Sequence, residues 1–188
     1  PRECVDKMII YHKANGGVSR YKKFRYYFEQ INTHEDNEKV INKAILRFAE
    51  IIHQGLMECD YIPGVMDFIQ KVKGIGLQLF VVSGSDEKEL KEVFRKKGIA
   101  SLFSNIYGSP PTKIRNMNKV IAKVGAQKQG LFFGDSKSDM EAAEEFGLDF
   151  IFVRGVSEWE EGNRISETIG YFIINDFTDK ALLRHSSN

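Results

Sequence analysis

The stretch GLFFGDSKSDMEAA, residues 130–143, carries an apolar run directly into two aspartates. Residues 131–133 are apolar, Asp135 follows one glycine later, and Asp139 comes four positions after Asp135. Burying an unpaired carboxylate is costly, so a buried strand that ends in two acids needs a compensating group. The stretch therefore predicts that a cation or a phosphate binds at this point of the fold.

The segments around this stretch alternate between strand and helix patterns. From Pro63-Gly64 onward, short apolar runs are separated by segments with helical spacing. Alternating strands and helices imply an α/β fold with a parallel, doubly wound sheet. We expect the first of these strands to be buried and Ser85 to cap the helix after it. The predicted strands are 77–82, 105–108, 131–133, 150–153 and 171–174, and the predicted helices are 65–74, 85–98, 112–124 and 137–146.

Residues 1–60 have a different, wholly helical character. Apolar residues recur at helical spacing between Val40 and Leu56, and Gly16-Gly17 interrupts an earlier helical stretch. Thr33, with Asp36 three positions later, resembles a helix-capping box. We therefore expect a small helical domain over residues 1–60 and an α/β domain over residues 61–188.

Composition excludes several classes of partner. The 188 residues include 27 Lys and Arg against 26 Asp and Glu, and a net charge of +1 gives no reason to expect nucleic acid or an anionic membrane. No apolar stretch approaches the length of a membrane span. Cys4 and Cys59 fit no metal spacing and no disulfide framework, so we expect a reduced, cytoplasmic protein. The composition does not indicate an oligomeric state.

Polar side chains follow three of the predicted strands, where ligands bind in sheets of this kind. Ser83 and Ser85 follow strand 77–82, Lys113 follows a Pro-Pro turn, and the third set is the aspartate pair. A hydroxyl and a lysine suit phosphoryl oxygens, and two carboxylates suit Mg²⁺, so the set predicts a phosphoryl-transfer site. Taken singly, the serines could be helix caps, the aspartates a cap and a solvated helix residue, and the lysine a surface charge.

The ordered set resembles the haloacid dehalogenase superfamily of phosphohydrolases, in the branch with a helical cap domain that includes phosphoglycolate phosphatase-like and β-phosphoglucomutase-like enzymes. LFVVSGS, with Ser83 and Gly84, resembles its second motif, and GSPPTK, with Lys113, its third. FFGDSKSD resembles the fourth motif, with Asp135 and Asp139 at the metal site. The resemblance implies catalytic roles for Ser83, Lys113 and Asp135, and phosphate binding by Ser83, Gly84 and Lys113.

Two further segments extend the resemblance to the helical domain. GGVSRYKKF resembles the cap loop that reaches the active site, with Arg20 as a substrate contact. YIPGV resembles the linker that returns from the cap to the core. The resemblance thus implies a Mg²⁺-dependent phosphatase that acts on a small phosphorylated metabolite. A phosphomutase of the same fold and a non-catalytic phosphate-binding protein are the alternatives.

The first motif of that family, a strand ending in Asp-x-Asp, is absent from the 188 residues. The resemblance places this strand between strands 77–82 and 131–133 and makes its first aspartate the nucleophile and its second the general acid and base. Leaving it out opens a gap of two strand spacings, roughly 9.5 Å. We expect that a segment upstream of Pro1 or another chain supplies the strand, and that the 188 residues alone are inactive and poorly folded.

Overall fold

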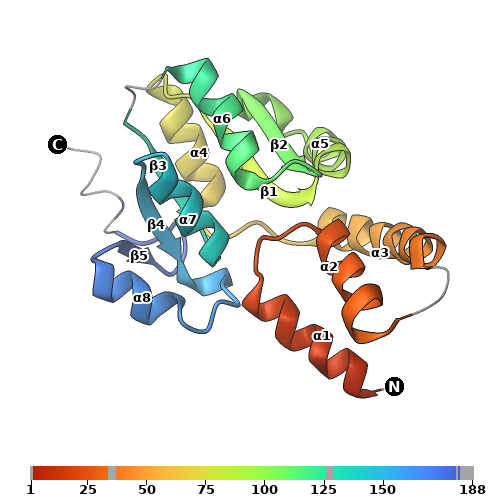
Figure 1. Cartoon of the computed structure of the whole chain (residues 1–188). Helices are drawn as coiled ribbons and strands as arrows, with labels where there is room; N and C mark the ends of the chain where they lie inside the picture. Colours follow the sequence, from red (N-terminus) through yellow and green to blue (C-terminus); the bar gives the residue numbers. More distant parts are fainter. Residues whose placement is uncertain (1, 34–36, 126–128, 181, 183–188) are drawn as a thin grey trace.

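The computed structural model describes residues 2–33, 37–125, 129–180 and 182, and it has a helical part and an α/β part (Figure 1). The helical part comes first in the chain. The predicted capping box at Thr33 and Asp36 lies partly outside the described residues. The helical part contains α1 (Arg2–Ala14), α2 (Arg20–Tyr26), a π-helical turn (Tyr27–Ile31) and α3 (Asn37–Glu58).

The α/β part contains five strands with helices between them, as the alternating pattern predicts. Its strands are β1 (Phe80–Asp86), β2 (Asn105–Ser109), β3 (Leu131–Gly134), β4 (Asp149–Val153) and β5 (Phe172–Ile174). Its helices are α4 (Val65–Gly74), α5 (Glu87–Lys96), α6 (Lys113–Val124), α7 (Lys137–Glu145) and α8 (Gly162–Ile169), with 3₁₀ turns at Ala100–Leu102 and Arg154–Val156.

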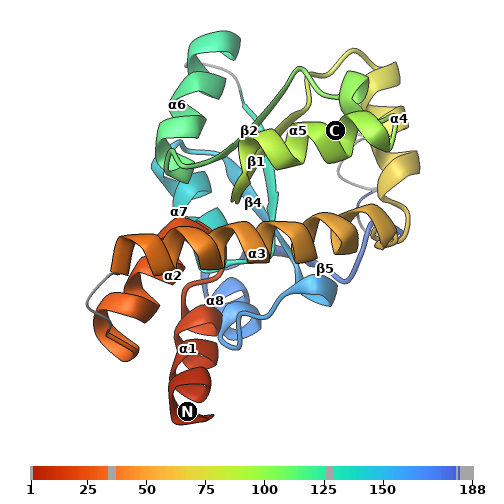
Figure 2. The ribbon, with the colours of Figure 1, turned by 90° about the vertical axis from the view of Figure 1, so that its right-hand side faces the viewer.

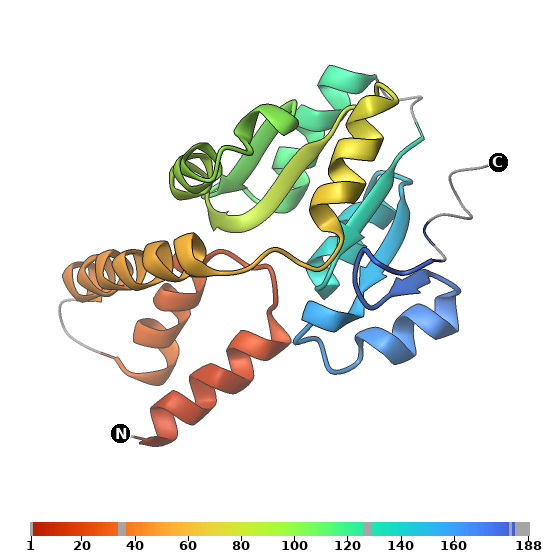
Figure 3. The same cartoon turned by 180° about the vertical axis from the view of Figure 1, so that it is seen from behind.

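All strand pairings are parallel, which confirms the predicted α/β class, but the strands form two separate sheets. β1 pairs with β2, and β3, β4 and β5 pair in that order. β1 and β3 are the strands of the two sheets that lie nearest each other (Figures 1 and 3). Within the described part of the chain they do not pair, so each has one edge without a strand partner. The sheet is interrupted at the interval where the family resemblance places one more strand.

The predicted strand 77–82 is displaced in the structure. β1 begins three residues later and extends to Asp86, and its residues are half-buried rather than buried. Pairing begins with Phe80 opposite Asn105, whereas Leu77 precedes the pairing region and is 58% exposed. The apolar run therefore includes residues that connect α4 to the sheet. The unpaired edge of β1 is consistent with the incomplete burial of the strand.

Helices cover both faces of the sheets and create the core. α6 and α7 lie on one side and α4 on the other (Figures 1 and 3). α6 packs against α7 and β1, and α7 also packs against β3 and β4. Phe150 and Phe152 of β4 are 2% and 1% exposed, and they pack with Met140 and Ala143 of α7. This packing fixes the start of α7, which carries Asp139.

The helical part lies beyond the carboxyl end of β1, and α3 runs across that end of the α/β part (Figures 1 and 2). Ile41 of α3 and Phe28 of the π-helical turn are buried, and Phe24 of α2 contacts Phe48 of α3 edge to face. α2 also packs against β1. The loop from α1 to α2 contains the predicted break at Gly16-Gly17 and lies against the α/β part. In the described ranges, none of the helices combines the length and apolar character that crossing a bilayer requires.

Candidate active site

Lys113 and Asp139 form a buried ion pair at the carboxyl end of β3. Lys113 begins α6, directly after the helix-capping Thr112, and Asp139 lies in the first turn of α7. The Lys113 Nζ to Asp139 Oδ1 distance is 2.5 Å, and the two side chains are 9% and 8% exposed. The contact of α6 with α7 thus brings the third and fourth predicted motifs together, and Lys113 is not an ordinary surface charge.

The other oxygen of Asp139 holds the start of α7. Ser136 Oγ donates to Asp139 Oδ2 at 2.6 Å, and the amides of Ser136 and Asp135 donate to the same oxygen at 3.1 and 3.3 Å. Ser136 is the capping residue of α7. Helix capping therefore accounts for Asp139 in part, but it does not account for the carboxylate of Asp135.

The Asp135 carboxylate accepts no hydrogen bond and no ion pair from another residue in the described part of the chain. It retains solvent exposure, and its backbone carbonyl accepts a hydrogen bond from Ser157 Oγ at 2.5 Å. Desolvation raises the pKa of Asp135, and the nearby Asp139 charge raises it further, while Lys113 opposes both effects. Two carboxylates thus share one lysine, which leaves a local negative charge that suits a cation.

The second predicted motif lies at the end of β1, and its serines do not cap α5. Asp86 is the capping residue, because its side chain accepts hydrogen bonds from the amides of Lys88 and Glu89. The predicted cap at Ser85 is therefore wrong, since the carboxylate one position later reaches those amides instead. Ser83 Oγ accepts a hydrogen bond from the amide of Ser85 at 3.1 Å and lines a cavity.

Gly17 of the α1–α2 loop lies between the second motif and the third and fourth motifs. A Cβ atom on Gly17 would lie 2.2 Å from Ser138 Oγ and 2.9 Å from Lys113 Nζ. A Cβ atom on Gly84 would lie 2.1 Å from the Gly17 carbonyl oxygen. Ser138 Oγ also donates to the Gly16 carbonyl at 3.1 Å. The glycines thus allow the loop to close directly over the site.

Arg20 lines the cavity but forms an ion pair with Glu89 of α5. Both side chains are less than a tenth exposed, and the Arg20 guanidinium also lies 5.2 Å from the centre of the Phe48 ring. The neighbouring Tyr21 donates its hydroxyl hydrogen to Asp86 at 2.7 Å. These contacts attach α2 to the start of α5. The role of Arg20 as a substrate contact stays a prediction.

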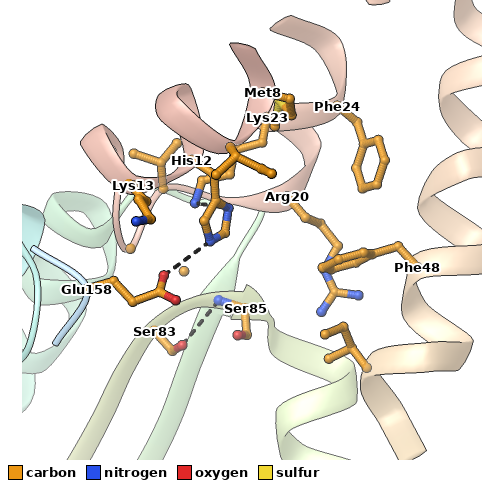
Figure 4. Close-up of a pocket in the computed structure, with 15 residues that line it drawn as sticks. Met8, His12, Lys13, Arg20, Lys23, Phe24, Phe48, Ser83, Ser85 and Glu158 are labelled. Atoms are coloured by element: carbon orange, nitrogen blue, oxygen red, sulfur yellow. Dashed lines mark hydrogen bonds and ion pairs between the residues drawn. The ribbon is translucent and has the colours of Figure 1, made fainter. Parts of the chain in front are cut away.

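A cavity of about 520 Å³ lies between the helical part and the carboxyl end of β1 (Figure 4). Ser83, Gly84 and Ser85 line it from the α/β part, whereas His12, Lys23 and aromatic residues line it from the helices. A second cavity of about 210 Å³ is lined by Lys113, Ser138 and Gly84. Because Gly84 and Gly17 line both cavities, the two spaces adjoin at the loop.

Several residues of this site were not apparent from the sequence. Gly17 belongs to the predicted helix break at Gly16-Gly17, but the sequence does not indicate that this residue lies beside Lys113. His12 and Glu158 lie on separate elements, with His12 Nε2 3.6 Å from Glu158 Oε2. Local spacing contains no signal for such a pair, because its members are far apart in the chain. The sequence pattern places Glu89 within the predicted helix 85–98 and contains no signal for its pairing with Arg20.

Residues 17–153 match the family of haloacid dehalogenase-like hydrolases. This match includes the loop at Gly17, the strand ends and the start of α7, so it covers the site as well as the fold. The chain belongs to the haloacid dehalogenase-like hydrolase family, and it is an enzyme of that type. No protein in the curated sequences is significantly similar to it.

Several solved structures have a similar fold. A predicted phosphoglycolate phosphatase from Haemophilus somnus has a TM-score of 0.64 and 20% identity, over 92% of this chain and 80% of that one. A haloacid dehalogenase-like family hydrolase from Streptococcus pneumoniae has a TM-score of 0.63 and 16% identity, over 92% and 84%. A β-phosphoglucomutase from Pyrococcus has a TM-score of 0.59 and 16% identity, over 89% and 78%. These similarities concern the fold.

Proposed function

We propose that the protein is a Mg²⁺-dependent phosphatase that hydrolyses a small phosphorylated metabolite. The observation that carries this proposal is the buried Lys113–Asp139 pair beside the carboxylate of Asp135, which forms no ion pair with any described residue. Lys113 would neutralise charge on the transferring phosphoryl group, because a fixed cation in a partly dry site stabilises developing negative charge. The Ser83 hydroxyl and the Gly84 backbone would bind its oxygens. Residues 1–60 would act as the cap domain over the core of residues 61–188, in the cytoplasm.

The residues present fit a magnesium ion. Mg²⁺ prefers oxygen ligands and is commonly held by one or two carboxylates together with waters and substrate phosphate. Asp135 offers a carboxylate that no other described residue contacts through a hydrogen bond or an ion pair, while the oxygens of Asp139 are already engaged. Asp135 would therefore ligate the ion, and Asp139 would contribute its charge and hold Lys113 in place. A bound Mg²⁺ would supply charge neutralisation for phosphoryl oxygens.

The nucleophile would be a carboxylate on a segment outside the 188 residues. It would attack phosphorus, displace the alcohol of the ester, and form an acyl phosphate that water then hydrolyses. The interval between β1 and β3 supports this proposal, because no described strand pairs with either of them at the edges that face it. A strand in that interval would end beside Asp135 and Ser83. A phosphomutase would use the same groups but would return the phosphoryl group to the sugar.

Replacing Asp135 with asparagine is expected to weaken Mg²⁺ binding at least about tenfold, since even outer-shell partners of metals contribute about 10- to 100-fold. Without Mg²⁺ the variant should be at least as stable as the wild type, because the raised pKa of Asp135 means that folding disfavours its charge. Calorimetric titration and thermal unfolding measure the two effects. Asp149→Asn, an exposed position at the start of β4, is the control. Equal Mg²⁺ affinity in wild type and Asp135→Asn would remove Asp135 from the site.

Replacing Gly17 with alanine is expected to lower kcat/KM at least about tenfold, because displaced catalytic groups lose large factors in rate. The new methyl group would collide with Ser138 and Lys113. Gly98→Ala is the matched control: Gly17 and Gly98 have φ angles of 71° and 72°, and nothing lies within 4 Å of a Cβ atom at Gly98. Both variants should lose stability through backbone strain. If both retain wild-type kcat/KM, the loop does not close over the catalytic groups.

A further inference from the structure

Lys23 on α2 is a buried cation that pairs with no carboxylate among the described residues. The residue is 8% exposed, and within the described part of the chain its Nζ forms no ion pair. Its hydrogen-bond partner is His12 of α1, whose Nδ1 lies 3.1 Å from Lys23 Nζ. A lysine ammonium group can only donate, so in this contact the His12 Nδ1 atom accepts from Lys23 when the ring is in the neutral tautomer with its hydrogen on Nε2.

The other two buried cations around the cavities are neutralised. Arg20 pairs with Glu89, and Lys113 pairs with Asp139. Lys23 has no such partner among the described residues. Desolvation lowers the pKa of Lys23, and the charge of Glu158 opposes this effect. Glu158 lies beyond His12, and its side chain is 71% exposed, so solvent screens its charge. The fold therefore retains a buried cation whose desolvation cost no ion pair among the described residues offsets.

The position of Lys23 indicates what could offset that cost. Lys23 and His12 line the cavity of about 520 Å³ from the helical side, opposite Ser83 and Ser85 at the end of β1 (Figure 4). A volume in the range of roughly 300–1,000 Å³, typical of ligand pockets, leaves room for more than a phosphoryl group. A molecule whose phosphoryl group lies at Ser83 would thus present its other end to Lys23.

We propose that Lys23, with His12, forms a second anion subsite that selects substrates with an anionic group, carboxylate or phosphate, at the end opposite the transferring phosphoryl group. This inference rests on the proposed function and specifies the substrate class of the same site. An anion at Lys23 would form the ion pair that no described residue forms with this side chain. His12 would hold the ammonium group in position by accepting one of its hydrogens. A neutral substrate would leave the cation buried and uncompensated.

Binding of non-hydrolysable phosphonates tests the subsite without requiring turnover. Calorimetry on the full-length protein with Mg²⁺ would compare carboxyalkylphosphonates of increasing chain length with alkylphosphonates and alkylene diphosphonates of matched length. The wild type should bind at least one bifunctional phosphonate about tenfold or more tightly than its alkyl counterpart, since a charge-assisted hydrogen bond contributes about that factor. The relative affinities of carboxylate and diphosphonate probes identify which anion the subsite accepts.

The substitution Lys23→Met keeps the length and apolar stem of the side chain and removes its charge. It should abolish the preference for bifunctional phosphonates and leave the affinity for alkylphosphonates within about twofold, while Lys23→Arg should retain part of the preference. Lys7→Met changes an exposed lysine of α1, paired with Glu3, and should leave every affinity unchanged. The Tm of Lys23→Met should not fall, because the variant loses an uncompensated buried charge.

Two results would overturn the inference. One is a wild type that binds alkylphosphonates but shows no preference for a second anion at any chain length. The other is a Lys23→Met variant that loses affinity equally for both probe classes, or whose Tm falls, as expected for a purely structural lysine. Failure of the proposed function is distinguishable, because it would appear as the absence of phosphonate binding and of ester hydrolysis in the wild type.

Discussion

Replacing Lys113 with alanine is expected to lower kcat at least about 100-fold, the range seen when one group that stabilises transition-state charge is removed. Lys113 is the one buried cation that borders the smaller cavity within the described residues, and its Nζ lies 2.5 Å from Asp139 Oδ1. Lys113→Arg should recover part of the activity, because it keeps the charge while changing its geometry. Steady-state kinetics of the full-length protein with a phosphate monoester and Mg²⁺ measure the effect.

Stability has to be measured beside the rate, because Lys113→Ala leaves the Asp139 carboxylate without its cation. Breaking one side of a buried pair costs about 3–5 kcal/mol, although the amides at the start of α7 still hold Asp139. The assay therefore uses a temperature well below the Tm of the variant. Lys123→Ala, an exposed lysine of the same helix, is the control. If a folded Lys113→Ala protein has the wild-type kcat, Lys113 does not stabilise the transition state and its role is structural.

The second large effect concerns the interval between β1 and β3. If a strand from outside the 188 residues fills it, the 188-residue chain alone should show no phosphatase activity and no cooperative thermal unfolding. Several unpaired backbone groups at about 1–3 kcal/mol each rival the whole stability of a domain, about 5–15 kcal/mol. A chain extended upstream should recover cooperative unfolding and activity together, because one segment would supply both the strand and the nucleophile.

The control for this comparison is an extension of the same length and composition with a scrambled sequence. It should restore neither cooperative unfolding nor activity. Cooperative unfolding of the 188 residues as a monomer, with the same Tm as the extended chain, would contradict the proposal. Activity in the 188 residues would contradict it more strongly, because none of the described residues has been assigned as a nucleophile.

The order of the elements was predictable because it follows from local patterns. The apolar run before Asp135 and the helical spacing after it indicated β3 and α7, and both form as predicted. The start of β1 was not predictable, because the apolar run begins at Leu77 while pairing begins where β2 provides a partner for Phe80. The capping residue of α5 was missed for a related reason: Ser85 and Asp86 both have cap chemistry, and backbone geometry selects Asp86.

Partners across the chain account for the rest of the difference. The sequence placed Lys113 and Asp139 after two predicted strands whose carboxyl ends face the same crevice, which made their proximity predictable, although not the ion pair itself. The pairing of Arg20 with Glu89, 69 positions apart, depends on how α2 packs at the start of α5. Among the described residues no carboxylate pairs with Lys23, and no sequence pattern predicts such an absence. The sequence therefore shows which residues of the helical part are charged, but it does not show which of them form ion pairs.

Release of inorganic phosphate by the full-length protein tests the central claim most directly. Malachite green detection would follow a panel of phosphate monoesters with Mg²⁺, after chelation with EDTA, and after Mg²⁺ is restored, for wild type and Asp135→Asn. The account predicts release that stops on chelation, returns with Mg²⁺, and falls at least about tenfold in the variant. Release that is unaffected by chelation and by Asp135→Asn, or no release from any ester by the folded protein, would contradict it.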